Sequence, residues 1–385
     1  MHPLARWKLR AVKPYVPGKP IEEVARELGL KEPIEKLASN ENALGPSPLA
    51  VEAVKKALGE MNLYPDDEAY YLKKKIAEKF GVDFDEVIVG NGSVEIVLML
   101  GLGFVYPGES IVASQGSFIM YKIVANLIGA DFIEPPLGED WRIDLDVLYR
   151  AIRPDTKLVF ISNPNNPTGT ALWRDEVEEF MNRIGDDVIV VWDEAYYEFV
   201  DKDRFPDTLK YVRQGKNVVV LRTFSKIYGL AGLRLGYGFA PKKIVEVLRR
   251  VRLPFNVNRI AQIAAIAALD DEEHLRRSRE LVLKGKLYLM KELQRLNIPY
   301  AHSETNFIFV EFPFDAGYIY ESLLKRGIIT RPLAGYNFPR ALRITVGTEE
   351  QNRKLIKALE EILGDREKIW NISKTSEVEG SPESL

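Results

Sequence analysis

Short apolar runs alternate with amphipathic stretches through the first two thirds of the chain. Seven runs rich in valine, isoleucine and aromatic residues predict strands at 86–90, 110–114, 131–135, 157–162, 187–193, 217–222 and 235–240. Between most of them lie patterns of helical period, for example at 94–104 and 175–184. Because the predicted strands are almost continuously apolar, the pattern indicates an α/β fold with a mostly parallel central sheet covered by helices on both faces.

The pattern changes after residue 254. Two strongly helical stretches come first, and shorter strands and helices then alternate up to residue 363. They are predicted as helices at 258–269, 271–296, 318–326 and 349–363 and as strands at 306–312, 327–332 and 341–347. We therefore expect a large domain over 45–270 and a smaller α+β domain over 271–365.

The two ends of the chain differ from these domains in composition. Residues 1–44 are proline-rich, and we expect them to be irregular and to wrap onto a neighbouring surface. Residues 366–385 are mostly polar and are expected to be disordered.

Composition narrows the class of protein further. The net charge of -3 over 385 residues argues against nucleic acid or an anionic membrane as the main partner. Cysteine is absent, which excludes disulfides and thiolate chemistry, and three histidines do not indicate a histidine-rich metal site. The first twenty residues contain no apolar core of a signal peptide, and no apolar run is long enough to span a bilayer, so we expect a cytoplasmic protein without membrane or metal partners.

Two glycine-containing segments follow predicted strands. In "VGNGSVE" (89–95), Gly90 and Gly92 let the backbone turn into a helix whose first N–H groups would attract phosphate. The alternative is an ordinary strand-to-helix turn capped by Ser93 or Asn91. In "SNPNNPTGT" (162–170), prolines and a glycine define a rigid turn, with more asparagine amides than a turn requires.

Two further segments place ionisable groups at strand ends. Asp193 ends an apolar strand, where a carboxylate needs a cationic partner or hydrogen-bond donors, although it is also suited to cap a helix. In "TFSKIYGLAGLRLGYG" (223–238), Thr223, Ser225 and Arg234 suit a phosphate. Lys226 is not explained by phosphate binding alone, and an unpaired ammonium is costly to bury there.

Together, the four segments predict a phosphate cradle, a buried carboxylate and a lysine at one edge of a sheet, where ligands of α/β folds bind. Pyridoxal phosphate requires this set. A lysine holds its aldehyde as a Schiff base, and a carboxylate keeps the pyridine nitrogen protonated. The lysine is neutral in that linkage, which removes the cost of burying its charge.

The order of these motifs resembles the fold-type I aminotransferases, and within them the histidinol-phosphate aminotransferase family. The resemblance extends roughly from residue 15 to 363 and includes "PYVPGKP", "LASNENALGPSP", "YPDDEAYYLKKKIA", "RLPFNVN" and "LRITVGTEEQN". It implies a homodimer that transfers the amino group of L-histidinol phosphate to 2-oxoglutarate, a step of histidine biosynthesis. Aromatic aminotransferases and a decarboxylase of a phosphorylated amino acid share many of the motifs, and both remain alternatives.

The resemblance also implies roles for individual residues. Lys226 matches the Schiff-base lysine and proton shuttle, and Asp193 the partner of the ring nitrogen. Asn166 and Tyr196 match the groups that bind the ring oxygen. The remaining residues match groups that bind the cofactor phosphate (Gly92, Ser93, Thr223, Ser225, Arg234), the phosphate of the neighbouring subunit's cofactor (Tyr64) or the substrate (Tyr15, Asn166, Arg331, Arg343).

Two departures from the family pattern concern the cofactor site. Val94 stands where many members have an acidic residue after the glycine-rich turn, so one contact near the phosphate is expected to be lost. "SQGSFIMY" replaces the usual aromatic turn, which makes Phe118 the candidate for stacking on the cofactor ring, although it is also suited to the core. The amino-terminal segment that carries Tyr15 is expected to cover the active site and the dimer interface.

A non-enzymatic cofactor-binding domain is a weaker alternative. Such domains come with an added DNA-binding segment, and no part of this chain has the length or the basic charge for one.

Overall fold

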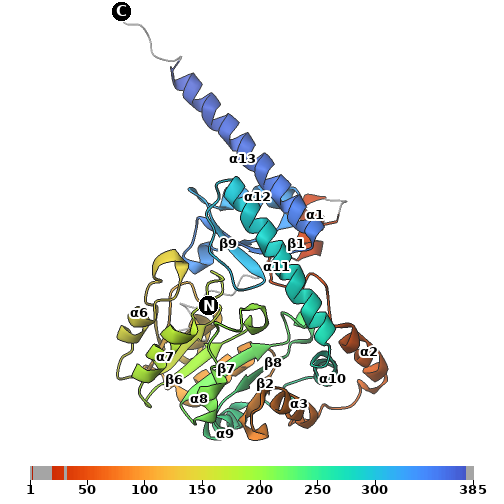
Figure 1. Ribbon diagram of the computed structural model, residues 1–385, viewed down its shortest axis with the longest axis vertical. Coiled ribbons are helices and arrows are strands. Elements are labelled where there is room, and N and C mark those ends of the chain that lie inside the picture. The colour runs from red at the N-terminus through yellow and green to blue at the C-terminus, as the bar shows by residue number, and fades with distance from the viewer. Residues whose placement is uncertain (1, 3–19, 30–32, 379–385) are drawn as a thin grey trace, which may run out of the picture.

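The computed structural model describes residue 2 and residues 20–29 and 33–378. The described chain forms a large lower domain and a smaller upper domain, joined by the long helix α11 (Glu272–Arg295) (Figure 1). Across these residues, no helix combines the length and the apolar content needed to cross a membrane.

The large domain is built on a seven-stranded sheet. Its strands, in spatial order, are β2 (Val87–Gly90), β8 (Gly236–Phe239), β7 (Val218–Thr223), β6 (Ile189–Asp193), β5 (Thr156–Ser162), β3 (Ser110–Ala113) and β4 (Asp131–Ile133). Strand β8 pairs antiparallel with both of its neighbours, and the other pairs are parallel. The seven predicted strands and the mostly parallel sheet are therefore confirmed.

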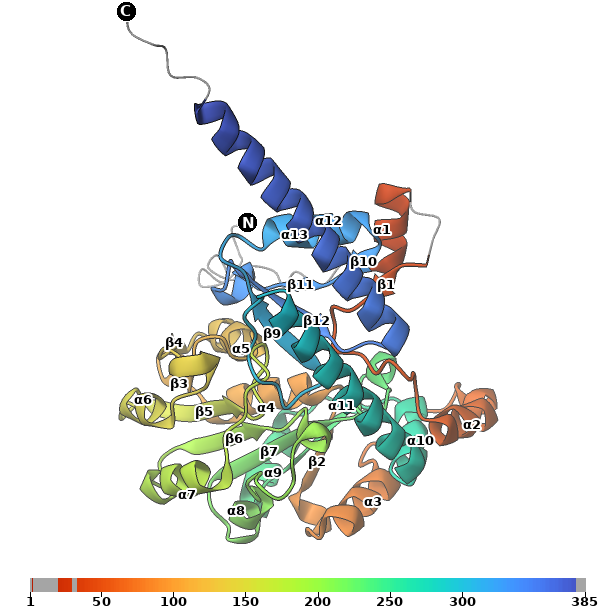
Figure 2. The same ribbon diagram turned by 45° about the horizontal axis from the view of Figure 1, so that its top comes forward.

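Alternation along the strands supplies a core on each face of this sheet. In β5, Leu158 and Phe160 belong to one cluster and Val159 and Ile161 to the other, because successive side chains point to opposite faces. Both faces are covered by helices, which explains why the strands are almost continuously apolar in their middle positions (Figure 2). The helices are α2 (Pro48–Ala57), α3 (Tyr70–Phe80), α4 (Ser93–Phe104), α5 (Met120–Ile128), α6 (Leu145–Arg150), α7 (Arg174–Arg183), α8 (Leu209–Arg213), α9 (Lys242–Val251) and α10 (Arg259–Ala268).

The small domain contains an antiparallel sheet in the order β11 (Arg331–Pro332), β12 (Ala341–Thr345), β9 (Phe307–Glu311). A two-stranded parallel sheet joins β1 (Glu35–Lys36) to β10 (Ile328–Ile329). Helices α11, α12 (Gly317–Lys325) and α13 (Glu349–Val378) pack around these strands.

The described part of the amino-terminal segment is more regular than the sequence predicts. Helix α1 (Ile21–Leu28) follows Pro20 and ends at Gly29, whose φ of 64° terminates a helix without strain. Val24 packs fully buried against Ala38 and residues of the small domain. The prolines of this segment lie before or after the helix and so do not interrupt it, which is why the expectation of an irregular segment was wrong here.

Two other elements differ from the prediction. The predicted strand at 327–332 is divided into β10 and β11, which pair with different partners. Helix α13 continues to Val378, beyond the predicted end at residue 363 and into the segment expected to be disordered. Residues 365–378 contain no glycine or proline that would end a helix, and arginine, glutamate and lysine favour its continuation.

Candidate active site

A cavity of about 390 Å³ opens at the carboxyl ends of three neighbouring strands. The last residues of β5, β6 and β7, which are Ser162, Asp193 and Thr223, all line it. Parallel strands end at the same edge of a sheet, which brings motifs from distant parts of the sequence together. Ten predicted residues line this cavity: Gly92, Ser93, Phe118, Asn166, Asp193, Tyr196, Thr223, Ser225, Lys226 and Arg234.

One end of the cavity has the features of an anion site. Helix α4 begins at Ser93, and no described side chain caps its first turn. Gly92 has a φ of 76°, and a Cβ atom there would lie 2.7 Å from Nη2 of Arg234. The alternative of a capped turn is therefore not found. The free helix terminus, the hydroxyls of Thr223 and Ser225 and the Arg234 guanidinium form a cradle suited to a phosphate group.

Lys226 lies in the loop after β7, and its Nζ donates a hydrogen bond to the backbone oxygen of Ser39 at 3.2 Å. The amine also lies 5.8 Å from the centre of the Tyr196 ring. Burial, followed by the positive charge of Arg343, lowers the pKa of Lys226 to about 7. A substantial part of the amine is therefore neutral and nucleophilic near neutral pH.

Asp193 is held by two neutral donors. The hydroxyl of Tyr121 donates to Oδ2 at 2.7 Å, and the backbone N–H of Ala195 donates to Oδ1 at 3.2 Å. The second contact closes a local turn. Asp193 does not cap a helix, because the next helical turn begins at Tyr197 and has Tyr196 at its N-cap position. Burial raises the pKa of Asp193 to about 6, which leaves the carboxylate largely ionised at neutral pH.

A hydrogen-bond network joins the large domain to the small domain above the cavity. Nη1 of Arg343, from β12, donates to Oδ1 of Asn166 at 2.5 Å, and Nη2 donates to the backbone oxygen of Ala38 at 2.8 Å. Nδ2 of Asn40 donates to the hydroxyl of Tyr196 at 2.8 Å. Burial raises the pKa of Tyr196 to about 12, so its hydroxyl stays protonated and available as a donor.

Four predicted residues do not line the cavity. Arg343 contacts its edge through Asn166, and Arg331 lies beside Arg343 as its register partner in the β11–β12 pair. Tyr64 is 79% exposed and stacks on Phe255 with ring centres 4.8 Å apart. Tyr15 lies outside the described residues.

The two departures from the family pattern are both found at the cavity. Val94 lines the wall without a polar side chain, and the neighbouring Glu95 turns instead to the backbone N–H of Asn91. Phe118 lines the cavity on one side and packs against the large core on the other, in an edge-to-face contact with Tyr121 at 5.7 Å. Phe118 thus contributes to the core and is also exposed to the cavity, and its stacking on a cofactor ring stays a prediction.

Sequence reasoning missed four contributors to the site. Ser39, Asn40 and Glu41 come from the chain that leads from β1 into the large domain, and Tyr121 comes from helix α5. The first three belong to "LASNENALGPSP", so the motif was available as a signal. Tyr121 has no local signal, since its contact with Asp193 joins residues 72 positions apart.

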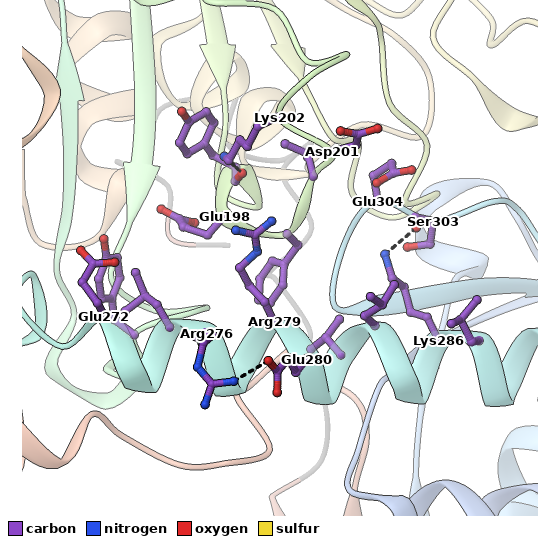
Figure 3. Close-up of a pocket in the computed structure, with 18 of the residues that line it drawn as sticks. Glu198, Asp201, Lys202, Glu272, Arg276, Arg279, Glu280, Lys286, Ser303 and Glu304 are labelled. Atoms are coloured by element: carbon purple, nitrogen blue, oxygen red, sulfur yellow. Dashed lines mark hydrogen bonds and ion pairs between the residues drawn. The ribbon is translucent and has the colours of Figure 1, made fainter.

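A larger cavity, of about 760 Å³, lies between helix α11 and residues 197–202 (Figure 3). Charged side chains on its walls neutralise one another, for Lys79 pairs with Glu272 at 2.5 Å and Arg276 with Glu280 at 2.5 Å. It contains none of the residues that the motifs predict for the cofactor. Volume alone therefore does not locate the chemistry of this protein.

Comparisons with known proteins identify the family of the chain. Residues 32–359 match the model of the family described as aminotransferase class I and II. A histidinol-phosphate aminotransferase of Moorella thermoacetica is 48% identical over 94% of this chain and 93% of its own length. One from Anaeromyxobacter sp. is 49% identical over 94% of this chain and 100% of its own length.

A solved structure resembles the fold over nearly the whole chain. The crystal structure of histidinol-phosphate aminotransferase from Sinorhizobium meliloti in complex with pyridoxal-5'-phosphate matches with a TM-score of 0.86 and 27% identity. The match covers 95% of this chain and 99% of that one. With the family model matching residues 32–359, this chain belongs to the class I and II aminotransferases.

Proposed function

We propose that this chain is a pyridoxal phosphate-dependent aminotransferase that converts L-histidinol phosphate and 2-oxoglutarate to imidazole acetol phosphate and L-glutamate. The observation that carries the reaction type is a lysine amine of lowered pKa, placed in one cavity with an anion cradle and a buried carboxylate. The names and the coverage of the curated relatives support the choice of amino donor.

The residues of the cavity fit the cofactor. The helix terminus at Gly92 and Ser93, with Thr223, Ser225 and Arg234, suits its phosphate, and the absence of a Cβ atom at Gly92 leaves room for Arg234. When bound, pyridoxal phosphate supplies an aldehyde for the amino group and a ring that withdraws electrons from the substrate. Phe118 offers an aromatic face to that ring.

The chain's own groups control charge and protons. Asp193 stabilises positive charge on the ring nitrogen, since an ionised carboxylate in a buried place favours a protonated partner. Lys226 carries the cofactor, and its amine moves a proton during the reaction because its pKa of about 7 allows both protonation states near neutral pH. Tyr196 and Asn166 donate hydrogen bonds to the ring oxygen.

Arginines bind the anionic groups of two different substrates. Histidinol phosphate carries a phosphate and glutamate carries two carboxylates, and a guanidinium pairs with two oxygens of either group. Arg343 is fixed on β12 and buried at the edge of the cavity, where it serves both substrates. Arg331, next to it on β11, reaches the distal group.

The active enzyme is a homodimer with shared sites. Tyr64 does not line the cavity of its own chain. Exposed apolar side chains lie near it in sequence or on the segment of Phe255, on which it stacks: Leu58, Met61, Leu63, Tyr70, Tyr71, Leu253 and Phe255. Such a group of exposed apolar residues is typical of a protein interface. In the dimer, Tyr64 binds the phosphate of the partner's cofactor.

Mixed dimers test the shared site. Lys226→Ala and Tyr64→Ala chains, each inactive or impaired alone, should recover activity when mixed, because one of the two sites then has both residues intact. A mixture of Lys226→Ala with Tyr106→Ala, another tyrosine that is 77% exposed, is the control for simple dilution. Verified exchange of subunits without recovery would contradict the shared site.

A screen of half-reactions tests the substrate. The purified protein is mixed separately with histidinol phosphate, phenylalanine, tyrosine and glutamate, and conversion of the cofactor is followed by absorbance. We expect rapid conversion with histidinol phosphate and glutamate. Faster conversion with phenylalanine or tyrosine would favour an aromatic aminotransferase, and release of carbon dioxide from a phosphorylated amino acid would favour a decarboxylase.

A further inference from the structure

The carboxylate of Asp193 accepts a hydrogen bond from a side chain 72 positions away in the sequence. Tyr121, on helix α5, donates to its Oδ2, and the only other described side-chain or backbone donor to that carboxylate is the N–H of Ala195. Both residues are almost fully buried, with exposed fractions of 0% for Tyr121 and 3% for Asp193. The hydroxyl therefore has no competing contact with bulk water.

Aromatic packing holds Tyr121 in this orientation. Its ring stacks on Phe160 of strand β5 with centres 4.5 Å apart and an angle of 8° between the planes. Phe118 meets it edge to face at 5.7 Å, and Phe118 also lines the cavity. Because β5 lies directly beside β6, which ends in Asp193, the stacking places the phenol at the strand end where the carboxylate is.

A neutral donor has a specific advantage over a cation at this position. An arginine or lysine paired with Asp193 would neutralise the carboxylate and weaken its attraction for a protonated ring nitrogen. Burial and the neighbouring Asp193 charge hold the pKa of Tyr121 well above its usual range, so the hydroxyl remains a donor throughout the physiological range. The hydrogen bond orients the carboxylate and leaves its negative charge available.

We propose that Tyr121 is a positioning residue that keeps the Asp193 carboxylate ionised and oriented toward the ring nitrogen of the cofactor. This inference rests on the proposed role of Asp193. It assigns to Tyr121 a part in cofactor binding that acts through another side chain.

Other charged and titratable groups around Asp193 do not replace this contact. Glu194, the next residue, raises the pKa of Asp193 and is itself paired with Arg222 at 2.8 Å. Lys226, from the loop after β7, lowers that pKa through its charge but makes no described hydrogen bond to the carboxylate. The Tyr196 hydroxyl accepts a hydrogen bond from Nδ2 of Asn40 and makes no described hydrogen bond to Asp193. The Tyr121 hydrogen bond is the largest contribution that opposes the effect of burial.

The test compares two ligands that differ only at the ring nitrogen. Pyridoxal phosphate and its 1-deaza analogue, which has carbon in place of that nitrogen, are titrated against the full-length protein freed of cofactor. The ratio of their dissociation constants isolates the ring-nitrogen interaction from the phosphate and lysine contacts. Tyr121→Phe removes only the hydroxyl, and Tyr237→Phe is the matched control, since Tyr237 is also fully buried and its hydroxyl has no hydrogen-bond partner among the described residues.

We expect the wild-type protein and Tyr237→Phe to prefer pyridoxal phosphate, and Tyr121→Phe to reduce that preference about tenfold, the usual scale for a hydrogen bond to a charged group. The reduction should grow as the pH falls, because Asp193 without its donor accepts a proton more readily. An equal loss of affinity for both ligands, or an unchanged ratio, overturns the inference.

Two further outcomes separate the role of Tyr121 from the role of Asp193. A wild-type protein that binds both ligands equally overturns the role of Asp193 and this inference with it, whereas a preference unchanged in Tyr121→Phe overturns the inference alone. Should Tyr121→Phe fail to fold, 3-fluorotyrosine at position 121 keeps the ring and makes the hydroxyl a stronger donor. The preference for pyridoxal phosphate should then persist to lower pH, and an unaltered pH dependence contradicts the proposal.

Discussion

Lys226 and Lys202 show how differently two lysines with lowered pKa can be placed. Burial is the main cause at both, and at Lys202 the neighbouring Glu198 opposes the shift. The Lys202 side chain is exposed along most of its length beside the larger cavity, while its amine turns to the backbone oxygen of Tyr197. Lys226 is partly buried in the smaller cavity, between the anion cradle and Asp193.

The comparison teaches that a perturbed lysine marks a catalytic site only together with suitable neighbours. Around Lys202 the charges on the cavity wall compensate one another locally, as in the pairs of Lys79 with Glu272 and Arg276 with Glu280. Around Lys226, no charged side chain of the described residues is in hydrogen-bond contact with Arg234 of the cradle or with the Asp193 carboxylate, which leaves both available to a ligand. Matched substitutions in the two cavities test this difference.

The largest expected effect is at the lysines themselves. Lys226→Ala should reduce turnover by at least about 10³-fold, because the covalent attachment and the proton carrier are both lost. Lys202→Ala should leave turnover close to that of the wild type. Steady-state rates with histidinol phosphate and 2-oxoglutarate at saturating cofactor measure both, and similar losses in the two variants would contradict the contrast.

The carboxylates of the two cavities give the next largest effect. Asp193→Asn should keep the cofactor bound and lose roughly 10²-fold or more in rate, since an amide contacts the ring nitrogen without stabilising its positive charge. Glu198→Gln, at a buried carboxylate of the larger cavity, is the control and should retain most activity. Near-normal turnover of Asp193→Asn at full cofactor content would show that Asp193 only forms the local turn and does not stabilise the ring nitrogen.

A third pair of substitutions concerns arginine. Arg343→Ala should impair both half-reactions by about 2–5 kcal/mol, as expected when a buried charge partner is removed. Arg331→Ala should weaken the two half-reactions unequally, because it reaches only the distal group. Arg279→Ala in the larger cavity serves as control. Rates measured separately with each donor check this, and unchanged rates in Arg343→Ala would make that residue purely structural.

The smallest effect is a shift in pH dependence. Cofactor-free protein should capture pyridoxal phosphate faster as the pH rises through about 7 and then reach a plateau, because the neutral amine of Lys226 is the nucleophile. Arg343→Ala removes a positive charge that lowers the pKa of Lys226, so its midpoint should move to higher pH. A wild-type midpoint near the ordinary lysine value of 10.5 would show that the amine is not perturbed.

The parts of the molecule that could be predicted are those that depend on residues close together in the sequence. Each strand of the large sheet has a local apolar pattern, and Asp193 and Lys226 stand at strand ends that the pattern locates. The shared edge of a parallel sheet then brings these residues into one cavity without further information. This is why the predicted strands and ten of the predicted cofactor residues are found together.

The parts that were not predicted depend on contacts between distant segments. The hydrogen bonds from Asn40 to Tyr196 and from Tyr121 to Asp193 join residues 156 and 72 positions apart. No periodicity in the sequence specifies such pairs, because they follow from the packing of the two domains and of helix α5. Helix α1 was missed for a different reason. The surrounding prolines suggested an irregular segment, and the burial of Val24 depends on its contact with the small domain.

The most direct test of the account identifies the lysine that carries the cofactor. The purified protein is reduced with borohydride, digested, and searched for the peptide that holds the pyridoxyl group. The account predicts that the label is found on Lys226 and is absent from Lys202, although the pKa of each amine is lowered. A label on Lys202, or on any lysine other than Lys226, would contradict the assignment of the active site to the smaller cavity.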